Sequence, residues 1–274
     1  MKVAVVRQRY VAIGGAERYL SALIDALLAR EHEVHLFART WTGEERPGLR
    51  RHRVPTVGTP GFASALTFAW GCQRLLAQAG CDVVFSLERT LRQDVYRAGD
   101  GCHREWLARR RRHLPAWRRP FLSLNPLHRT LLALERRTFA PDHTRRVIAN
   151  SSRGRDEIVR LFGFPADRIS VVLNGVDCQR FRPLGVPAAR SDVRLLFVGT
   201  GFERKGLRFC IEALARLPVA CRLQVVGKGD PHPHLRRAAQ LGVADRVEFL
   251  GTTVVLTKAY PAAEVLVHPA IYAR

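Results

Sequence analysis

Two adjacent cations follow a glycine-rich turn in the stretch FVGTGFERKG, residues 197–206. A predicted β-strand ends before Gly199 and a predicted helix begins at Leu207, so Arg204 and Lys205 stand just before the first turn of a helix. A helix N-terminus presents free N–H groups and partial positive charge, which favour a bound phosphate. Arg204 could add a bidentate guanidinium and Lys205 a mobile point charge, which together suit a pyrophosphate. The alternative is a solvated Arg–Lys pair, although the helix dipole disfavours cations at that end.

The same loop lacks residues that two common nucleotide-binding motifs require. Gly199 and Gly201 match the first glycines of a dinucleotide fingerprint, but Arg204 takes the place of the third glycine. No acidic residue closes the next predicted strand, where one would hold a ribose. Gly201 and Gly206 have P-loop spacing, but Leu207 stands where the P-loop requires lysine. The sequence therefore argues against an NAD site and excludes ATP hydrolysis of the P-loop kind.

A second pair of glycines, Gly14 and Gly15, precedes the first predicted helix, and Glu17 lies in the first turn of that helix. Two glycines let backbone N–H groups approach a ligand closely, and an acidic residue in the first turn matches the helix dipole. The pattern fits a ligand-binding loop. It is also explained by a tight turn between strand and helix.

Short apolar runs alternate with stretches of helical periodicity along the chain, which predicts an α/β fold. The unit formed by a strand at 3–6, a helix at about 20–28 and a strand at 33–37 is typical of parallel sheets, whose ligands bind at the carboxyl ends of the strands. Further strands are predicted at 82–86, 146–150, 169–173, 193–198, 223–226, 247–250 and 265–268, and further helices at 152–161, 207–217, 235–241 and 258–263.

Turn residues at 174–177 and the segment RPLGVP at 182–187 interrupt this alternation. We therefore expect two Rossmann-like domains: residues 1–185, which include the linker, and residues 186–274. The second is shorter than the roughly 100–150 residues typical of a domain, so we expect its fold to be incomplete.

Composition predicts a globular protein that is attracted to polyanions. Of the 274 residues 47% are hydrophobic, enough for a sizeable core, and the formal net charge is +21. That charge favours nucleic acid, an anionic membrane or a phosphorylated substrate as partner. No apolar run approaches the roughly 18 residues of a membrane span, and the six cysteines lack the spacing of a metal site. We expect a cytoplasmic protein without a bound metal.

Four stretches match one known family in order and spacing: GGAER (14–18), LNGVD with FRP (173–177 and 181–183), FVGTGFERKG (197–206) and VLVHPA (265–270). They resemble family 4 of the nucleotide-sugar glycosyltransferases, whose GT-B fold has two facing Rossmann-like domains. The resemblance covers essentially the whole chain. It implies transfer of a hexose, with glucose favoured, from a UDP-sugar with retention of anomeric configuration, and no metal or other cofactor.

On the donor side, the resemblance implies that Arg204 and Lys205, with Gly201 in the same loop, neutralise the charge that grows on the departing UDP diphosphate. From the other domain, the loop with Gly14 and Gly15, followed by Glu17, would contact the same diphosphate.

On the acceptor side, Asp100 resembles the acidic residue that orients the acceptor hydroxyl or accepts its proton. His103 is a second catalytic candidate, the alternative being a surface histidine. The stretches 94–103 and 135–139 resemble the enzymes that add glucose to heptose in the lipopolysaccharide core. The acceptor would then be that core, or else another polysaccharide or lipid-linked glycan.

In the family, the second domain continues past the His-Pro stretch to an E-x(7)-E motif whose acids contact the donor. The present sequence ends at Arg274, before that motif. We therefore expect a truncated donor domain with weak or absent transfer. The alternative outside the transferases is a noncatalytic basic binding module.

Between Arg104 and Arg119 arginines alternate with Trp106, Leu107, Leu114 and Trp117. This composition suits the surface of an anionic membrane, with tryptophan at the headgroup boundary and arginine on phosphates. It would also suit RNA, or be a solvated basic loop. Given a lipid-linked, phosphorylated acceptor, we expect peripheral binding to the inner face of the cytoplasmic membrane rather than to nucleic acid.

Overall fold

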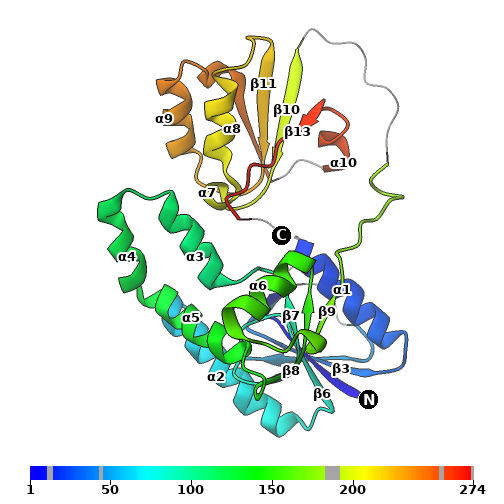
Figure 1. The fold of residues 1–274 in the computed structure, drawn as a ribbon. Helices are drawn as coiled ribbons and strands as arrows, with labels where there is room; N and C mark the ends of the chain where they lie inside the picture. Colours follow the sequence, from blue (N-terminus) through cyan, green and yellow to red (C-terminus); the bar gives the residue numbers. More distant parts are fainter. Residues whose placement is uncertain (11–14, 43–45, 183–191, 253–255, 273–274) are drawn as a thin grey trace. The chain divides into compact units, whose positions relative to one another are not determined.

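The computed structural model describes residues 1–10, 15–42, 46–182, 192–252 and 256–272, and of residues 15–18 only the backbone. The chain forms two compact units, Met1–Asn174 and Gly175–Ala273 (Figure 1). Each unit has its own parallel sheet with helices packed on it, as the sequence predicts. The predicted domain boundary after residue 185 lies outside the described residues.

The first unit is built on a seven-stranded parallel sheet in the order β5-β3-β1-β6-β7-β8-β9. Its strands are β1 (Lys2–Val6), β3 (Glu33–Ala38), β5 (Leu49–Arg53), β6 (Val83–Ser86), β7 (Gln93–Ala98), β8 (Thr144–Ala149) and β9 (Ile169–Val171). Two short strands, β2 (Arg9–Tyr10) and β4 (Thr40–Trp41), pair with each other in parallel.

Helices bury both faces of this sheet. In β1, Val3 and Val5 pack in the core cluster that contains Leu20 of α1 (Gly15–Leu28), whereas Ala4 and Val6 pack in the cluster that contains Phe68 of α2 (Gly61–Ala79). Successive side chains of a strand point to opposite faces, so a strand covered on both faces is a continuous apolar run. This is why the sequence at the N-terminus shows no polar alternation.

The helices of the first unit are α1 (Gly15–Leu28), α2 (Gly61–Ala79), α3 (His103–Arg112), α4 (Arg119–Leu124), α5 (Pro126–Thr138) and α6 (Ser152–Phe162), with 3₁₀ turns η1 (Ala116–Arg118) and η2 (Ala166–Arg168). Figure 1 shows α3 and α4 extending beyond the sheet of this unit. No helix within the described ranges is both long enough and apolar enough to cross a membrane.

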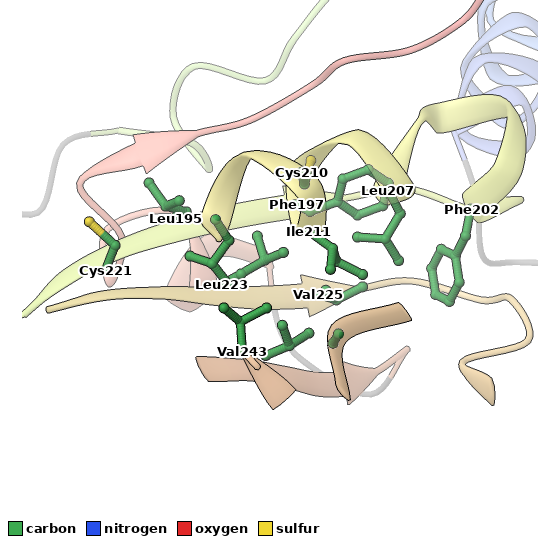
Figure 2. Packing of buried hydrophobic residues seen from close by; sticks show 13 residues of the cluster. Leu195, Phe197, Phe202, Leu207, Cys210, Ile211, Cys221, Leu223, Val225 and Val243 are labelled. Atoms are coloured by element: carbon green, nitrogen blue, oxygen red, sulfur yellow. The ribbon is translucent and has the colours of Figure 1, made fainter. Parts of the chain in front are cut away.

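The second unit has a four-stranded parallel sheet in the order β12-β11-β10-β13. The strands are β10 (Val193–Val198), β11 (Cys221–Val226), β12 (Val247–Gly251) and β13 (Val265–Leu266), and the helices are α7 (Phe202–Lys205), α8 (Leu207–Leu214), α9 (His232–Gln240) and α10 (Leu256–Ala259), with the 3₁₀ turn η3 (Ala244–Arg246). Figure 2 shows the apolar face of α8, with Leu207 and Ile211, packed on Phe197, Leu223 and Val225. On the opposite face of the sheet, Ala259 of α10 joins a smaller cluster.

The predicted strands and helices of both units are found, with shifted ends. The helix predicted to reach Leu217 ends at Leu214, because Pro218 disfavours a helical conformation of the residue before it. The strand predicted at 265–268 is confined to Val265–Leu266.

Because Leu223 is fully buried between β10, α8 and α9, Leu223→Ala should lower the free energy of unfolding of the second unit by about 2–5 kcal/mol. The matched change Leu266→Ala removes a side chain that is 54% exposed on β13 and should cost about 0.5 kcal/mol or less. Tryptophan fluorescence would report only on the first unit, which contains all four tryptophans: Trp41, Trp70, Trp106 and Trp117. Unfolding of the second unit is therefore measured by hydrogen exchange of the β10 and β11 amides under denaturant. Equal losses in the two variants would contradict the assigned core.

Candidate active site

Close backbone contacts shape the carboxyl edge of the second sheet. Gly227 has φ +144°, and a Cβ there would lie 1.8 Å from the carbonyl oxygen of Gly199. The amide of Gly199 donates to the carbonyl of Val226 at 2.9 Å, and the amide of Gly201 donates to the carbonyl of Lys228 at 3.0 Å. The loops after β10 and β11 are therefore locked together, and glycine is required where they meet.

The cations Arg204 and Lys205 lie in the short helix α7, directly before α8. Gly201 and Gly206 flank α7 with φ +71° and +77°, a conformation that glycine adopts without strain. Phe202 is buried and packs edge-on against Phe197, at 6.1 Å between ring centroids, which anchors the turn in the core. The predicted position of the two cations before the helix is confirmed. The α7 turn itself is too short for a periodicity to predict it.

The stretch after β13 closes on α7 from a distant part of the sequence. A Cβ at Gly206 would lie 1.9 Å from the carbonyl oxygen of Pro269, and the amide of Ile271 donates to the carbonyl of Arg204 at 3.1 Å. The Nζ of Lys205 lies 3.2 Å from Nε2 of His268. Two of the stretches that carry the family resemblance, 197–206 and 265–270, thus meet at one place.

Two adjacent cations gather at this place, and Glu203 precedes them in the same helical turn. Within the described part of the chain, no carboxylate forms an ion pair with Arg204 or Lys205. Burial and then the charge of Arg204 lower the pKa of Lys205, and burial followed by Lys205 and Arg204 lowers the pKa of His268. Lowered pKa values mean that the protonated forms are disfavoured here. A bound anion would relieve this repulsion, and the geometry therefore suits a phosphate or diphosphate.

The predicted glycine loop of the first unit is only partly described. Gly14 lies outside the described residues, Gly15 begins α1, and Glu17 follows in the first turn of that helix with an undescribed side chain. Their assignment to the diphosphate stays a prediction.

At the carboxyl edge of the first sheet, two acidic residues follow adjacent strands. Asp100 follows β7 and is exposed, and its carboxylate has no hydrogen-bond partner among the described residues. Glu88 follows β6, forms an ion pair with Arg7 at 3.2 Å and accepts a hydrogen bond from the amide of Gln8 at 3.1 Å. Burial raises the pKa of the Glu88 carboxyl, and the charge of Asp100 adds to this rise against the opposing effect of Arg7. A carboxylate that is free to accept a proton or a hydroxyl hydrogen bond is thus available at Asp100.

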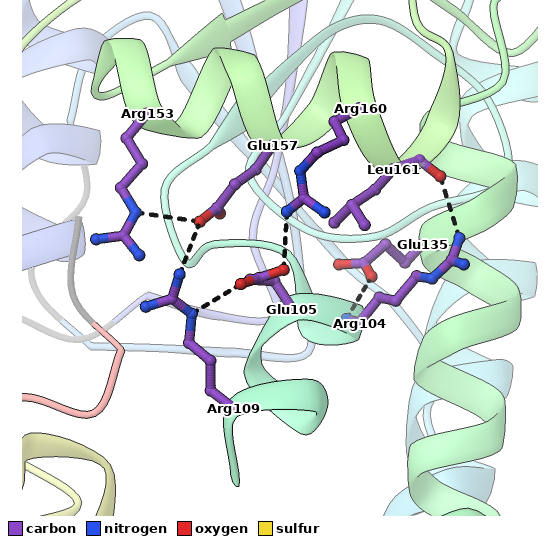
Figure 3. Close-up of polar contacts among 8 residues, drawn as sticks. All are labelled: Arg104, Glu105, Arg109, Glu135, Arg153, Glu157, Arg160 and Leu161. Atoms are coloured by element: carbon purple, nitrogen blue, oxygen red, sulfur yellow. Dashed lines mark hydrogen bonds and ion pairs between the residues drawn. The ribbon is translucent and has the colours of Figure 1, made fainter. Parts of the chain in front are cut away.

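A buried carboxylate lies beneath the loop that carries Asp100. Glu135 of α5 is fully buried and accepts a hydrogen bond from the amide of His103 at 2.5 Å. It also accepts one from the amide of Arg104 at 2.9 Å (Figure 3). It also pairs with Nη2 of Arg89 at 3.2 Å, and the same nitrogen donates to the carbonyl of Gly101 at 3.1 Å. The start of α3 is therefore fixed from inside the unit.

His103, the second predicted catalytic residue, has a partner on α5. Its Nε2 lies 3.2 Å from Nδ1 of His128, so one ring donates and the other accepts. Burial, Arg89 and His128 lower the pKa of His103 to about 4. The ring is therefore neutral near pH 7, and no hydrogen bond joins it to Asp100 in the described structure.

A network of ion pairs holds α3 on α6. Glu105 pairs with Arg109 at 2.8 Å and with Arg160 at 2.9 Å, and Glu157 pairs with Arg153 at 3.2 Å and with Arg109 at 3.9 Å (Figure 3). Nη1 of Arg104 also donates to the carbonyl of Leu161 at 3.1 Å. The side chains of two arginines of the basic segment, Arg104 and Arg109, therefore make contacts within the unit.

Exposed apolar side chains lie near the end of the basic segment and just beyond it. Trp117 is 65% exposed, and Phe121 and Leu124 of α4 are 63% and 67% exposed. The guanidinium carbon of Arg118 lies 4.5 Å from the centroid of the Trp117 ring. A hollow of about 360 Å³ lies beside them and is also lined by Arg110. The aromatic and apolar surface continues beyond the predicted segment into α4.

Sequence reasoning missed the roles of Glu88, Arg89 and Glu135. Glu88 and Arg89 stand directly beyond the predicted strand at 82–86, which is where a parallel sheet places ligand-binding residues, and that position could have identified them. The contacts of Glu135 have no local signal, because its partners lie 31 and 32 residues earlier in the chain.

In the described structure, each of the two Rossmann-like parallel units places charged groups beyond the carboxyl ends of its strands: the cations Arg204 and Lys205 in one unit and the exposed carboxylate of Asp100 in the other. Two such units are the architecture of the GT-B glycosyltransferases. A model of Glycosyltransferase Family 4 matches residues 13–180, and a model of Glycosyl transferases group 1 matches residues 192–274. The chain belongs to glycosyltransferase family 4, so the enzyme class expected from the sequence is confirmed.

Individual relatives agree with this assignment. The lipopolysaccharide glucosyltransferase WaaG of Escherichia coli K12 is 27% identical over 286 residues, which cover 98% of this chain and 74% of WaaG. A crystal structure of WaaG, described as a glycosyltransferase involved in lipopolysaccharide biosynthesis, matches with TM-score 0.83 at 25% identity over 98% of this chain and 75% of that chain. Anabaena HepE, solved in complex with UDP-glucose, matches in fold with TM-score 0.65 at 18% identity over 98% of this chain and 74% of its own.

The buried, neutral His103 ring should make the first unit lose stability in mild acid. The unfolded chain has a histidine pKa of about 6.5, against about 4 in the folded unit, so below pH 6.5 the unfolded state binds the proton first. The stability contributed by neutral His103 is fully present above pH 6.5 and is lost as pH falls toward 4. Urea unfolding followed by tryptophan fluorescence should show a steeper decline over this range for the wild type than for His103→Asn. Parallel pH profiles would contradict the prediction, as would a His103 NMR titration midpoint at or above 6.5.

Proposed function

We propose that this glycosyltransferase moves a hexose, with glucose favoured, from a UDP-sugar to a lipopolysaccharide core acceptor, with retention of anomeric configuration. The observation that carries the proposal is the Arg204–Lys205 pair, which is held at the start of α8 and forms no ion pair with a carboxylate among the described residues. Two adjacent cations favour the binding of an anion of at least comparable charge, and a nucleoside diphosphate carries such a charge.

In the proposed reaction, negative charge grows on the diphosphate as the bond to the sugar breaks. Arg204 can hold two phosphate oxygens with its planar guanidinium, and Lys205 can exchange its contact with His268 for a phosphate oxygen. The turn that carries both groups is anchored in the core by Phe202 before the reaction, so its backbone needs little rearrangement as the charge develops. The fold of HepE, which was solved with UDP-glucose, supports a uridine nucleotide as donor.

Asp100 is the proposed group on the acceptor side. Its carboxylate is exposed and has no partner within the described ranges, so it can orient an acceptor hydroxyl or take its proton. WaaG aligns with nearly the whole chain, and it is named a lipopolysaccharide glucosyltransferase. That name supports a lipopolysaccharide acceptor and a glucosyl donor for the present enzyme. The proposed mechanism uses no metal.

We propose that the protein binds peripherally to the anionic inner face of the cytoplasmic membrane. Trp117, Phe121 and Leu124 form an exposed apolar group, with Arg118 and Arg119 exposed beside them. Apolar rings at the headgroup boundary with arginines on lipid phosphates are the features of an interfacial segment. A lipid-linked acceptor would be presented at that surface.

Arg204→Ala should weaken UDP binding about 10- to 100-fold, the loss expected when a charge-assisted contact to phosphate is removed. Isothermal titration calorimetry with UDP measures this directly, and uridine, which lacks the diphosphate, should bind both proteins alike. Arg216→Ala removes an exposed arginine beyond the end of α8 and serves as the matched control with unchanged affinity. Wild-type UDP affinity in Arg204→Ala, or no UDP binding by the wild type, would favour the noncatalytic binding module.

The wild type should sediment with vesicles that contain phosphatidylglycerol and much less with pure phosphatidylcholine vesicles. The double variant Trp117→Ala/Phe121→Ala should lose most of this binding, because it removes the apolar contact while leaving the charge unchanged. Trp70→Ala is the control, since Trp70 is 68% exposed on α2, outside the basic segment. Equal binding to both vesicle types, or equal loss in the control, would argue against the membrane assignment.

A further inference from the structure

The Arg89–Glu135 pair is an ion pair that the first unit holds away from water. Glu135 is fully buried, and the Arg89 side chain is 17% exposed. Burying an ion pair costs desolvation free energy that the attraction between its members often does not exceed, so such a pair is weak evidence for a gain in stability. Its contacts point to another role.

Glu135 replaces the missing cap of α3. The residue before the helix is Cys102, whose side chain makes no capping hydrogen bond. The first amides of a helix need acceptors from outside the helix. Glu135 accepts from the amides of His103 and Arg104, and its negative charge matches the positive end of the helix dipole. A side chain of α5 therefore fixes where α3 begins.

The same contacts enclose the short loop that carries Asp100. Arg89 holds the carbonyl of Gly101, and Asn150 donates to the carbonyl of Gly99 at 3.2 Å. Asp100 thus stands between two fixed carbonyl groups, with the two fixed amides following at the start of α3, while its own carboxylate has no hydrogen-bond partner among the described residues. Gly101 has φ +83°, which makes the sharp turn between Asp100 and α3.

We propose that the buried Arg89–Glu135 pair is a positioning device for Asp100: it fixes the loop from inside the unit so that the exposed carboxylate keeps one orientation toward the acceptor. Neither residue reaches solvent as Asp100 does, so both act through the backbone of the loop and not on the substrate. This inference rests on the proposed role of Asp100 in the transfer reaction. The backbone fixation itself can be measured without that reaction.

The test compares Glu135→Gln with Glu157→Gln. Glu157 is also a buried carboxylate, and it pairs with Arg153 and Arg109 between α6 and α3. In Glu135→Gln, the amides of His103 and Arg104 should exchange with deuterium about tenfold faster or more. Turnover should fall about 10- to 100-fold with the donor KM and the UDP affinity unchanged, because a misplaced catalytic group costs rate rather than donor binding. Glu157→Gln should leave exchange at these two amides and turnover near the wild-type values.

Removal of one partner leaves the other charge buried and unpaired, so the double variant Arg89→Met/Glu135→Gln separates stability from positioning. It should recover thermal stability relative to Glu135→Gln while exchange at His103 and Arg104 stays fast and turnover stays low. Wild-type exchange at these amides in Glu135→Gln would overturn the proposal, and so would wild-type turnover in a folded double variant. If Asp100→Asn leaves transfer unchanged, the proposed role of Asp100 fails instead, and the exchange data still decide whether the pair fixes the loop.

Discussion

Arg204 and Lys205 repel one another, and the packing of the second unit keeps them together. Phe202 anchors their helical turn in the core, the glycines at 201 and 206 give the turn its two sharp ends, and the backbone after β13 closes on it through Ile271. Burial, and after it the neighbouring charge of Arg204, lowers the pKa of Lys205. In the folded unit without a ligand, the repulsion between these two cations is not relieved, and a bound anion would relieve it. The packing of this unit is thereby linked to its proposed chemistry.

The first unit has a complementary arrangement at the carboxyl edge of its own sheet. There the acidic groups differ in environment: Asp100 is exposed, Glu88 is paired with Arg7, and Glu135 is fully buried with Arg89. Burial determines what each can do, because a carboxylate withdrawn from water fixes the backbone, and only one that reaches solvent can meet a substrate. Adjacent parallel strands bring Glu88 and Asp100 to one edge, and α5 brings Glu135 beneath the loop that carries Asp100.

Much of this fold could be predicted from the sequence, since most strands are apolar runs covered on both faces. Two strands of the first sheet could not. β5 reads LRRHR and is an edge strand whose His52 is covered by stacking on Phe37, and β7 reads QDVYRA and buries Gln93 and Arg97 through polar contacts. Periodicity detects only apolar burial, so polar burial by hydrogen bonding escapes it. The cation pair was predictable from local spacing, whereas the Glu135 contacts arise only when α5 packs beside α3.

The most direct test of the central claim is a crystal structure of the protein with UDP-glucose. The account predicts that the diphosphate lies within hydrogen-bond distance of the Arg204 guanidinium and the Lys205 ammonium at the start of α8, with the contact between Lys205 and His268 lengthened or broken. A nucleotide bound with its diphosphate away from Arg204 and Lys205, or an unchanged site at saturating UDP-glucose, would contradict it.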